Sequence, residues 1–306
     1  MFYHLASLKT FWGILLIAVA AAYSTGLFAG SGPAGSDQRL LVIYDPLDFD
    51  PILREDSEDI MTGRAVHRRV ITINDSKHID VGYNVYAKGV GGHVPYAYTK
   101  DEICYFPSGE FYVVSDGEEV TTRPGYFMWR PAYAATQTAI ITEDAVSICA
   151  FAPARDVGWA HRVPQSDVGK WSGDPADKPR VVFYDFRDFK PLQRPGSHVY
   201  QSGKIVHRRV ISKSNDGAVY MDASHDTLKA GAEVGPLAYT VDRACWLESG
   251  NIEISSNGTS YSMSANQFML QPAYTKTDHI KVVRDSTMIC FFAPAIDNGW
   301  GHVISD

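Results

Sequence analysis

Short apolar or alternating runs, separated by turn signals, fill most of the chain after residue 36. Runs of this length that are rich in β-branched and aromatic residues predict strands. Outside the N-terminal segment we find no stretch of about a dozen residues with a good helical stripe. The pattern therefore predicts an all-β protein whose antiparallel strands close into barrels. The clearest strand candidates are residues 103–106, 110–114, 126–129, 138–141 and 147–151.

This pattern occurs twice in the chain. Residues 42–51 return in similar form at 182–191, and the run Val-His-Arg-Arg-Val-Ile at 66–71 returns unchanged at 206–211. The displacement between the copies is 140 residues here and 141 further along. Self-similarity at a fixed spacing is the signature of duplicated structural units. The repeat therefore predicts two like domains, at 39–164 and 179–306, joined by a linker at 165–178.

The first 36 residues differ from everything that follows. Lys9 is their only lysine or arginine, and residues 11–22 form an unbroken apolar run that continues with interruptions to residue 29. The short run suits a signal peptide, whereas the extended stretch at 11–29 is long enough to cross a bilayer. Both interpretations predict domains outside the cytoplasm, either secreted or periplasmic after cleavage or anchored through this segment, with no other membrane contact.

Composition narrows the partners. The chain has 306 residues and a formal net charge of −7, and it lacks a run of basic residues interleaved with aromatics. A protein that neutralises phosphates needs a basic surplus. We therefore expect no nucleic acid partner, and a small molecule as the ligand.

Two motifs in the first copy resemble the cupin superfamily. Glu102 is followed after six residues by Gly109, and Gly125 leads after five residues to Pro131. The hairpin between the motifs is most similar to the cupin subgroup of the ethanolamine-utilisation and ureidoglycine-aminohydrolase barrels. The resemblance implies two tandem cupin domains, each a jelly-roll barrel or double-stranded β-helix, and a homodimer would be ordinary for such proteins.

The first copy departs from the cupin metal-binding pattern. Metal-binding cupins place two histidines before the glutamate and a third after the second motif, as ligands for a transition metal. Here those positions hold Tyr96, Tyr98 and Thr136, so only Glu102 remains. One alternative is an irregular site for a divalent transition metal formed by Glu102, a tyrosine and the nearby His93. The other is an ion pair of Glu102 with Arg130 or another cation, with His93 as an ordinary loop residue.

The second copy departs further. An arginine, Arg243, stands where the first copy has its glutamate. A guanidinium there would repel a metal cation, so we expect the second barrel to be free of metal. The other ligand positions of this copy hold Leu237, Tyr239 and Thr277.

Candidate chemistry therefore concentrates in the first barrel. One hypothesis is an enzyme of the lyase, isomerase, hydrolase or oxygenase type, with Glu102 as base or metal ligand. The other is a binding or sensing protein that holds a sugar or a carboxylate without catalysis. Our catalytic candidates are Glu102, Tyr96, Tyr98 and Tyr133, and our ligand-binding candidates are Arg69, Trp129, Arg130 and Thr136.

The cysteines also follow the repeat. Cys104 with Cys149, and Cys245 with Cys290, occupy matching places in the two copies. Each pair joins the strand after the first motif to the last strand, and these strands can be neighbours in a jelly roll. A compartment outside the cytoplasm allows disulfides to persist. Buried free thiols are the alternative.

Overall fold

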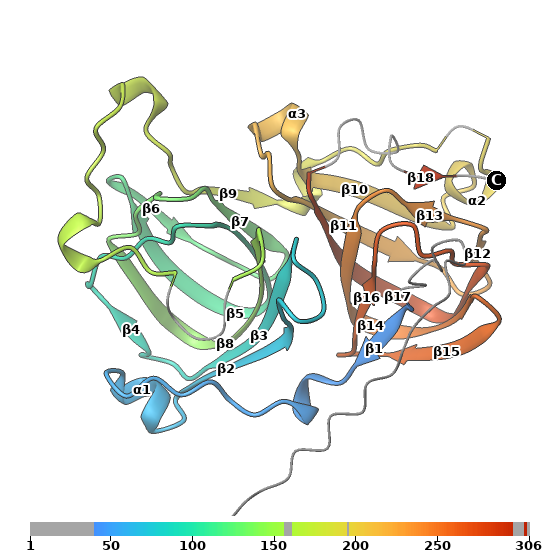
Figure 1. Ribbon diagram of the computed structural model, residues 1–306, viewed down its shortest axis with the longest axis horizontal. Helices are drawn as coiled ribbons and strands as arrows, with labels where there is room; N and C mark the ends of the chain where they lie inside the picture. Colours follow the sequence, from blue (N-terminus) through green and yellow to red (C-terminus); the bar gives the residue numbers. More distant parts are fainter. Residues whose placement is uncertain (1–39, 156–160, 195, 296–302, 305–306) are drawn as a thin grey trace, which may run out of the picture. The chain divides into compact units, whose positions relative to one another are not determined.

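Two antiparallel sheets, each with eight strands, contain most of the described chain, which confirms the all-β prediction (Figure 1). The computed structural model describes residues 40–155, 161–194, 196–295 and 303–304. Within these ranges the helices are short, and no helix is long and apolar enough to cross a bilayer. The predicted export or anchor segment, 1–36, lies outside the described residues.

The first barrel is built from the first copy of the repeat, in the strand order β2-β3-β8-β5-β7. β4 and β6 pair with β8 and β5 as short additions to this path. The strands are β2 (Ala65–Ile71), β3 (Asp80–Tyr86), β4 (Gly91–Gly92), β5 (Asp101–Ser115), β6 (Glu118–Thr121), β7 (Tyr126–Arg130) and β8 (Thr138–Ala152).

The second barrel repeats this order with β10, β11, β17, β14 and β16. A separate two-stranded ladder joins β13 to β18. The strands are β10 (Ile205–Ile211), β11 (Asp222–Leu228), β12 (Glu233–Val234), β13 (Ala238–Tyr239), β14 (Asp242–Ser256), β15 (Thr259–Ser264), β16 (Phe268–Gln271), β17 (His279–Ala293) and β18 (Val303–Ile304). The α-helices, of one turn each, are α1 (Glu58–Met61), α2 (His198–Gln201) and α3 (Lys213–Asp216). The 3-10 turns are η1 (Pro46–Asp48), η2 (Gln165–Asp167), η3 (Pro175–Asp177) and η4 (Phe186–Asp188).

The two copies exchange their first strands. β1 (Val42–Tyr44) pairs with β16 of the second barrel, and β9 (Val182–Asp185) pairs with β7 of the first. These are the matching segments that open the two copies in sequence. Each barrel is therefore completed by a strand from the other copy.

Long strands bend without breaking at a glycine in each copy. The predicted strands 103–106 and 110–114 both lie within β5. The register of β5 with β8 shifts between Tyr105 and Phe111. Gly109 lies at this irregularity with a φ of +74°, and a Cβ there would come within 2.3 Å of the Asp144 carbonyl oxygen. Glycine is needed at this position because it alone combines that backbone conformation with the close approach.

Side chains that alternate between the two faces of a strand contribute to two different hydrophobic cores. Ile103 and Tyr105 of β5 point to a cluster that contains residues of both barrels, whereas Cys104 and Phe106 point into the interior of the first barrel. Successive side chains of a strand face opposite sides, so one strand serves both cores. Tyr105 adds a hydrogen bond from its hydroxyl to Oε1 of Glu248 in the second copy (3.1 Å).

His225 of β11 lies at this shared core against the exchanged segment. Its ring stacks on Phe186, which follows β9, with centroids 3.6 Å apart and planes inclined by 3°. Burial lowers the pKa of His225 to about 4, against an opposing effect of Asp226 and with a further lowering by Arg208. The imidazole is therefore neutral at physiological pH.

We expect His225 to make the protein sensitive to acid. The unfolded chain binds a proton on this residue below its ordinary pKa of about 6.5, whereas the folded chain does so only near pH 4. The contribution of His225 to the free energy of unfolding therefore falls by about 1.4 kcal/mol for each unit that the pH decreases between about 6.5 and about 4. Urea unfolding from pH 7 to 4 should show a shallower decline for His225→Phe, which keeps an aromatic ring but does not titrate. The exposed His78, changed to glutamine, is the control, and parallel curves for wild type and His225→Phe would contradict the prediction.

Candidate functional site

The interior of the first barrel contains a polar cavity of about 50 Å³. Strands β2, β3, β5 and β8 supply most of its walls, and Ile52, Tyr98 and Arg155 from loops supply the rest. Its polar lining residues are His67, Arg68, Arg69, Asn84, Tyr86, Tyr98, Glu102 and Arg155.

A buried ion pair joins Glu102 to Arg130 within this barrel. The two residues are direct neighbours across β5 and β7, and Nη1 of Arg130 donates to Oε2 of Glu102 at 2.5 Å. Nη2 of Arg130 donates to the Tyr96 hydroxyl (3.0 Å) and to Oγ1 of Thr136 (2.9 Å). The predicted Glu102, Tyr96, Thr136 and Arg130 are thus brought together, in a network centred on the arginine.

Two tyrosines flank this guanidinium. Its central carbon lies 4.5 Å from the ring centroid of Tyr96 and 5.3 Å from that of Tyr98, within the range of cation–π attraction. Burial raises the pKa of Tyr98, so its hydroxyl stays protonated. Burial also raises the pKa of Glu102, and the positive charge of Arg130 opposes that rise.

A second buried ion pair, which sequence reasoning missed, joins Asp80 to Arg155. Nη2 of Arg155 donates to Oδ1 of Asp80 at 2.8 Å, and its backbone N–H donates to Oδ2 at 2.6 Å. The Arg155 guanidinium also lies 3.2 Å from the ring centroid of Phe151. The duplication of Asp80 as Asp222 was the available signal, but Arg155 stands in a loop whose path the strand pattern does not fix.

His67 and Arg69 project from β2 toward the same cavity. A hydrogen bond joins Nδ1 of His67 to Oδ1 of Asn84 (2.9 Å). Burial lowers the pKa of His67 to about 4, and nearby guanidinium groups, Arg155 foremost, lower it further against the effect of Asn84. Burial and then Arg155 also lower the pKa of Arg69, to about 10. Burial is the main cause of both shifts, and neighbouring guanidinium groups add to it.

Arginines predominate among the charged side chains that line this cavity. They are Arg68, Arg69 and Arg155, and the carboxylate among the lining residues is Glu102. A small anion in the cavity could accept charge-assisted hydrogen bonds from an arginine.

Two predicted site residues lie elsewhere. Trp129 packs against the core that the barrels share, because its neighbour Arg130 points inward and adjacent residues of a strand face opposite sides. Tyr133 sits in a turn with a φ of +67° and is 52% exposed. The hydrogen bonds and ring contacts of Arg130 described above involve neither residue, so their assignment to the site stays a prediction.

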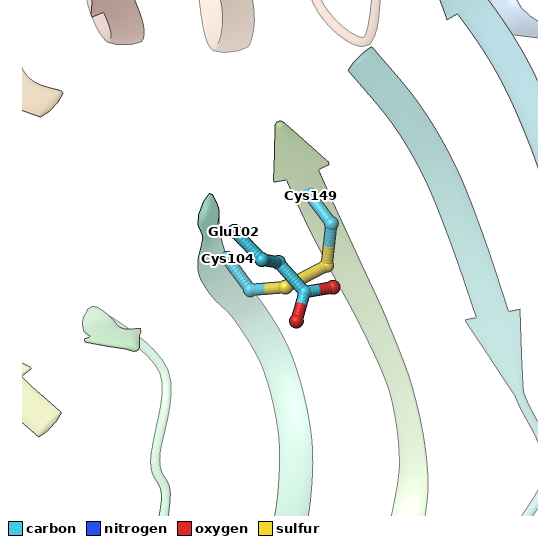
Figure 2. Close-up of side chains that lie close together, drawn as sticks. All are labelled: Glu102, Cys104 and Cys149. Carbon is cyan, nitrogen blue, oxygen red and sulfur yellow. A yellow bond between two sulfur atoms is a disulfide. The ribbon is translucent and has the colours of Figure 1, made fainter. Parts of the chain in front are cut away.

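Both cysteine pairs form disulfides in the structure. Cys104 is bonded to Cys149, and Cys245 to Cys290, each pair lying directly opposite across a strand ladder. Figure 2 shows the Cys104–Cys149 bridge beside the Glu102 carboxylate in the first barrel.

The side chains of the first barrel do not fit the predicted divalent metal. His93 is exposed and hydrogen-bonded to Thr138, whereas Glu102 is buried and neutralised by Arg130. Among the described residues, the acidic, cysteine and histidine side chains close enough to share an ion are Glu102, Cys104 and Cys149. Both sulfurs of that group are held in a disulfide, so they offer no thiolate.

Solved structures similar to this chain are oxalate decarboxylases. The enzyme of Bacillus subtilis, in a study of its Mn(II) centres, matches with a TM-score of 0.59 at 10% identity over 86% of this chain and 79% of that chain. The formate complex of the Lactobacillus farciminis enzyme matches with a TM-score of 0.61 at 10% identity, over 86% and 88%. The chain has a bicupin fold.

The similarities to these structures concern the fold only, because the sequence identity is 10%. No protein-family profile and no curated protein sequence matches the chain. The narrower resemblance to the ethanolamine-utilisation and ureidoglycine-aminohydrolase subgroup stays a prediction.

Proposed function

We propose that this bicupin binds a small carboxylate in its first barrel without catalysing a metal-dependent reaction. The observation that supports the proposal is a polar cavity in the first barrel that the buried arginines Arg69 and Arg155 line. Arg69 is the residue that we choose to test, because it is buried and lines the cavity from β2.

The size of the cavity supports a small ligand. About 50 Å³ corresponds to roughly four water-sized spheres. A compact mono- or dicarboxylate suits that space and charge better than a sugar does. The similar solved structures are named for oxalate and one was determined with formate, both of which are small carboxylates.

The geometry favours binding over catalysis. A general base must reach its substrate's proton, and an acid or base works best when its pKa lies near the working pH. The carboxylate of Glu102 instead forms an ion pair with Arg130, and the same guanidinium donates hydrogen bonds to Tyr96 and Thr136. The enzyme hypothesis would require this network to open when substrate binds.

Calorimetric titration with oxalate and formate tests the proposal. We expect both to bind the wild-type protein, and oxamide, the neutral counterpart of oxalate, not to bind. Arg69→Met should weaken oxalate binding at least tenfold, since a hydrogen bond to a charged group contributes about 1.5–3 kcal/mol. Arg69→Lys should weaken it less, because it keeps the charge but not the forked geometry.

An exposed arginine provides the matched control. Arg123→Met removes the same side chain from the surface and should leave binding unchanged. The proposal fails if neither carboxylate binds at millimolar concentration, or if Arg69→Met binds oxalate as tightly as the wild type does.

We further propose that the protein works outside the cytoplasm. The two disulfides support this location, because such bonds persist in oxidising compartments. Cell fractionation with an antibody tests it, and recovery of the protein in the cytoplasmic fraction would contradict it.

A further inference from the structure

The second barrel has its own interior cavity, of about 40 Å³, with a character unlike that of the first. Most of its lining is apolar. One exception is Arg243, which projects from β14 and is only 4% exposed. The other polar lining residues are Tyr200, Tyr239 and the hydrogen-bonded pair of His207 and Asp226. The apolar lining residues include Ile205, Leu228, Leu237, Val282, Met288 and Phe292.

Arg243 has unused hydrogen-bonding capacity. Its Nη1 donates to the Tyr239 hydroxyl at 3.0 Å, and its guanidinium carbon lies 4.8 Å from the centroid of that ring. Its Nε and Nη2 are buried and have no hydrogen-bond partner among the residues that the structure describes. These two nitrogens carry the parallel N–H bonds on one side of the guanidinium, the arrangement that a carboxylate accepts as a fork.

Nearby charged side chains are engaged with one another. His207 bonds through Nδ1 to Oδ1 of Asp226 at 2.5 Å, and Arg209 pairs with Asp222 at 2.9 Å. Within the described ranges no carboxylate forms an ion pair with Arg243. A buried arginine without a counter-ion is unfavourable unless something supplies the negative charge.

Comparison with the first barrel shows how this arginine lost its partner. Arg243 and Gln271 are neighbours across β14 and β16, as Glu102 and Arg130 are across β5 and β7. Gln271 donates through Nε2 to the Thr275 carbonyl (2.9 Å) and to Oγ1 of Thr277 (3.0 Å). The second barrel therefore has its cation where the first has its carboxylate, and it has an uncharged amide where the first has its cation.

We propose that the second barrel binds a short-chain monocarboxylate. The carboxylate forms the forked pair with Nε and Nη2 of Arg243, and the alkyl group contacts Leu237, Met288 and their apolar neighbours. The cavity corresponds to about three water-sized spheres, which suits acids of two to four carbons. This site is separate from the one proposed in the first barrel, whose walls are polar.

Titration of the full-length protein with propionate tests this site. We expect propionate to bind the wild type and to raise its melting temperature, and propionamide, which lacks the charge, to do neither. Arg243→Gln should weaken propionate binding at least tenfold and leave oxalate binding unchanged. Because oxalate reports on the first barrel and propionate on the second, failure of one proposal can be told apart from failure of the other.

Two further variants guard the interpretation. Arg243→Lys retains the charge without the fork and should bind with intermediate affinity, and Arg284→Gln removes an exposed arginine of the same barrel and should bind like the wild type. The proposal is overturned if the wild type does not bind propionate below about 10 mM, a Kd at which binding contributes only about 2.7 kcal/mol. It is equally overturned if Arg243→Gln binds as tightly as the wild type, or if a crystal grown in propionate shows no propionate at Nε and Nη2 of Arg243.

Discussion

Replacing Glu102 with glutamine is expected to lower the free energy of unfolding by about 3–5 kcal/mol. The change leaves the Arg130 guanidinium buried without its counter-ion, because Tyr96 and Thr136 supply hydrogen bonds but no negative charge. Both partners of the pair are almost completely shielded from water, so solvent cannot replace the lost carboxylate.

Urea unfolding at neutral pH measures this effect. Arg130→Met should be as harmful, since it leaves the carboxylate alone, whereas the double variant Glu102→Leu/Arg130→Met should recover much of the loss because it removes both charges. The exposed pair Lys170–Asp167 provides the control, and Asp167→Asn should change stability by less than about 1 kcal/mol. A comparably small effect for Glu102→Gln would show that the buried pair does not hold the barrel together.

Removing the Cys104–Cys149 bridge is expected to lower the free energy of unfolding by about 4 kcal/mol. The two cysteines are 45 residues apart, and the bridge stabilises the fold mainly by restricting the unfolded chain. The Cys245–Cys290 bridge spans the same separation, so its removal should have a similar effect.

Guanidinium unfolding of the double alanine variants, one pair at a time, tests this prediction. Each variant should lose stability again when the remaining bridge is reduced. Alkylation of the unfolded, unreduced wild type supplies the chemical check and should label no cysteine. Labelling of all four would mean that the bridges are not formed in the protein, and equal stability with and without reductant would mean that they do not stabilise it.

The strand pattern predicted the fold class well but cut the strands too short. Residues 103–106 and 110–114 were expected as separate runs and form the single strand β5, Asp101–Ser115. Gly109 looked like a turn signal, whereas the structure uses its positive φ for an irregularity within a continuing strand. A glycine marks both situations, so local sequence cannot separate them.

The strand exchange could not be predicted from the repeat. Segments 42–51 and 182–191 resemble each other, and each has the composition of a strand. Local pattern predicts that a strand forms, but the choice of partner depends on which of two similar sheet edges it reaches.

The candidate site was predicted in part. An ion pair of Glu102 with Arg130 or another cation was one of the two alternatives that the sequence left open, and in the structure the partner is Arg130. Trp129 was named for its residue type, and it faces away from Arg130 because adjacent residues of a strand face opposite sides. Arg155 was missed because its role depends on tertiary contact with Asp80, which no sequence spacing expresses.

The exchange of β1 and β9 means that neither half of the repeat contains all the strands of one barrel. A fragment that ends before β9 would leave the β7 edge of the first barrel unpaired, and a fragment that begins after β1 would leave the β16 edge of the second unpaired. Exposed strand edges of this kind promote association with other chains. Each half therefore depends on the other for a closed sheet edge, although their interiors differ in charge at one matching position, Glu102 in the first and Arg243 in the second.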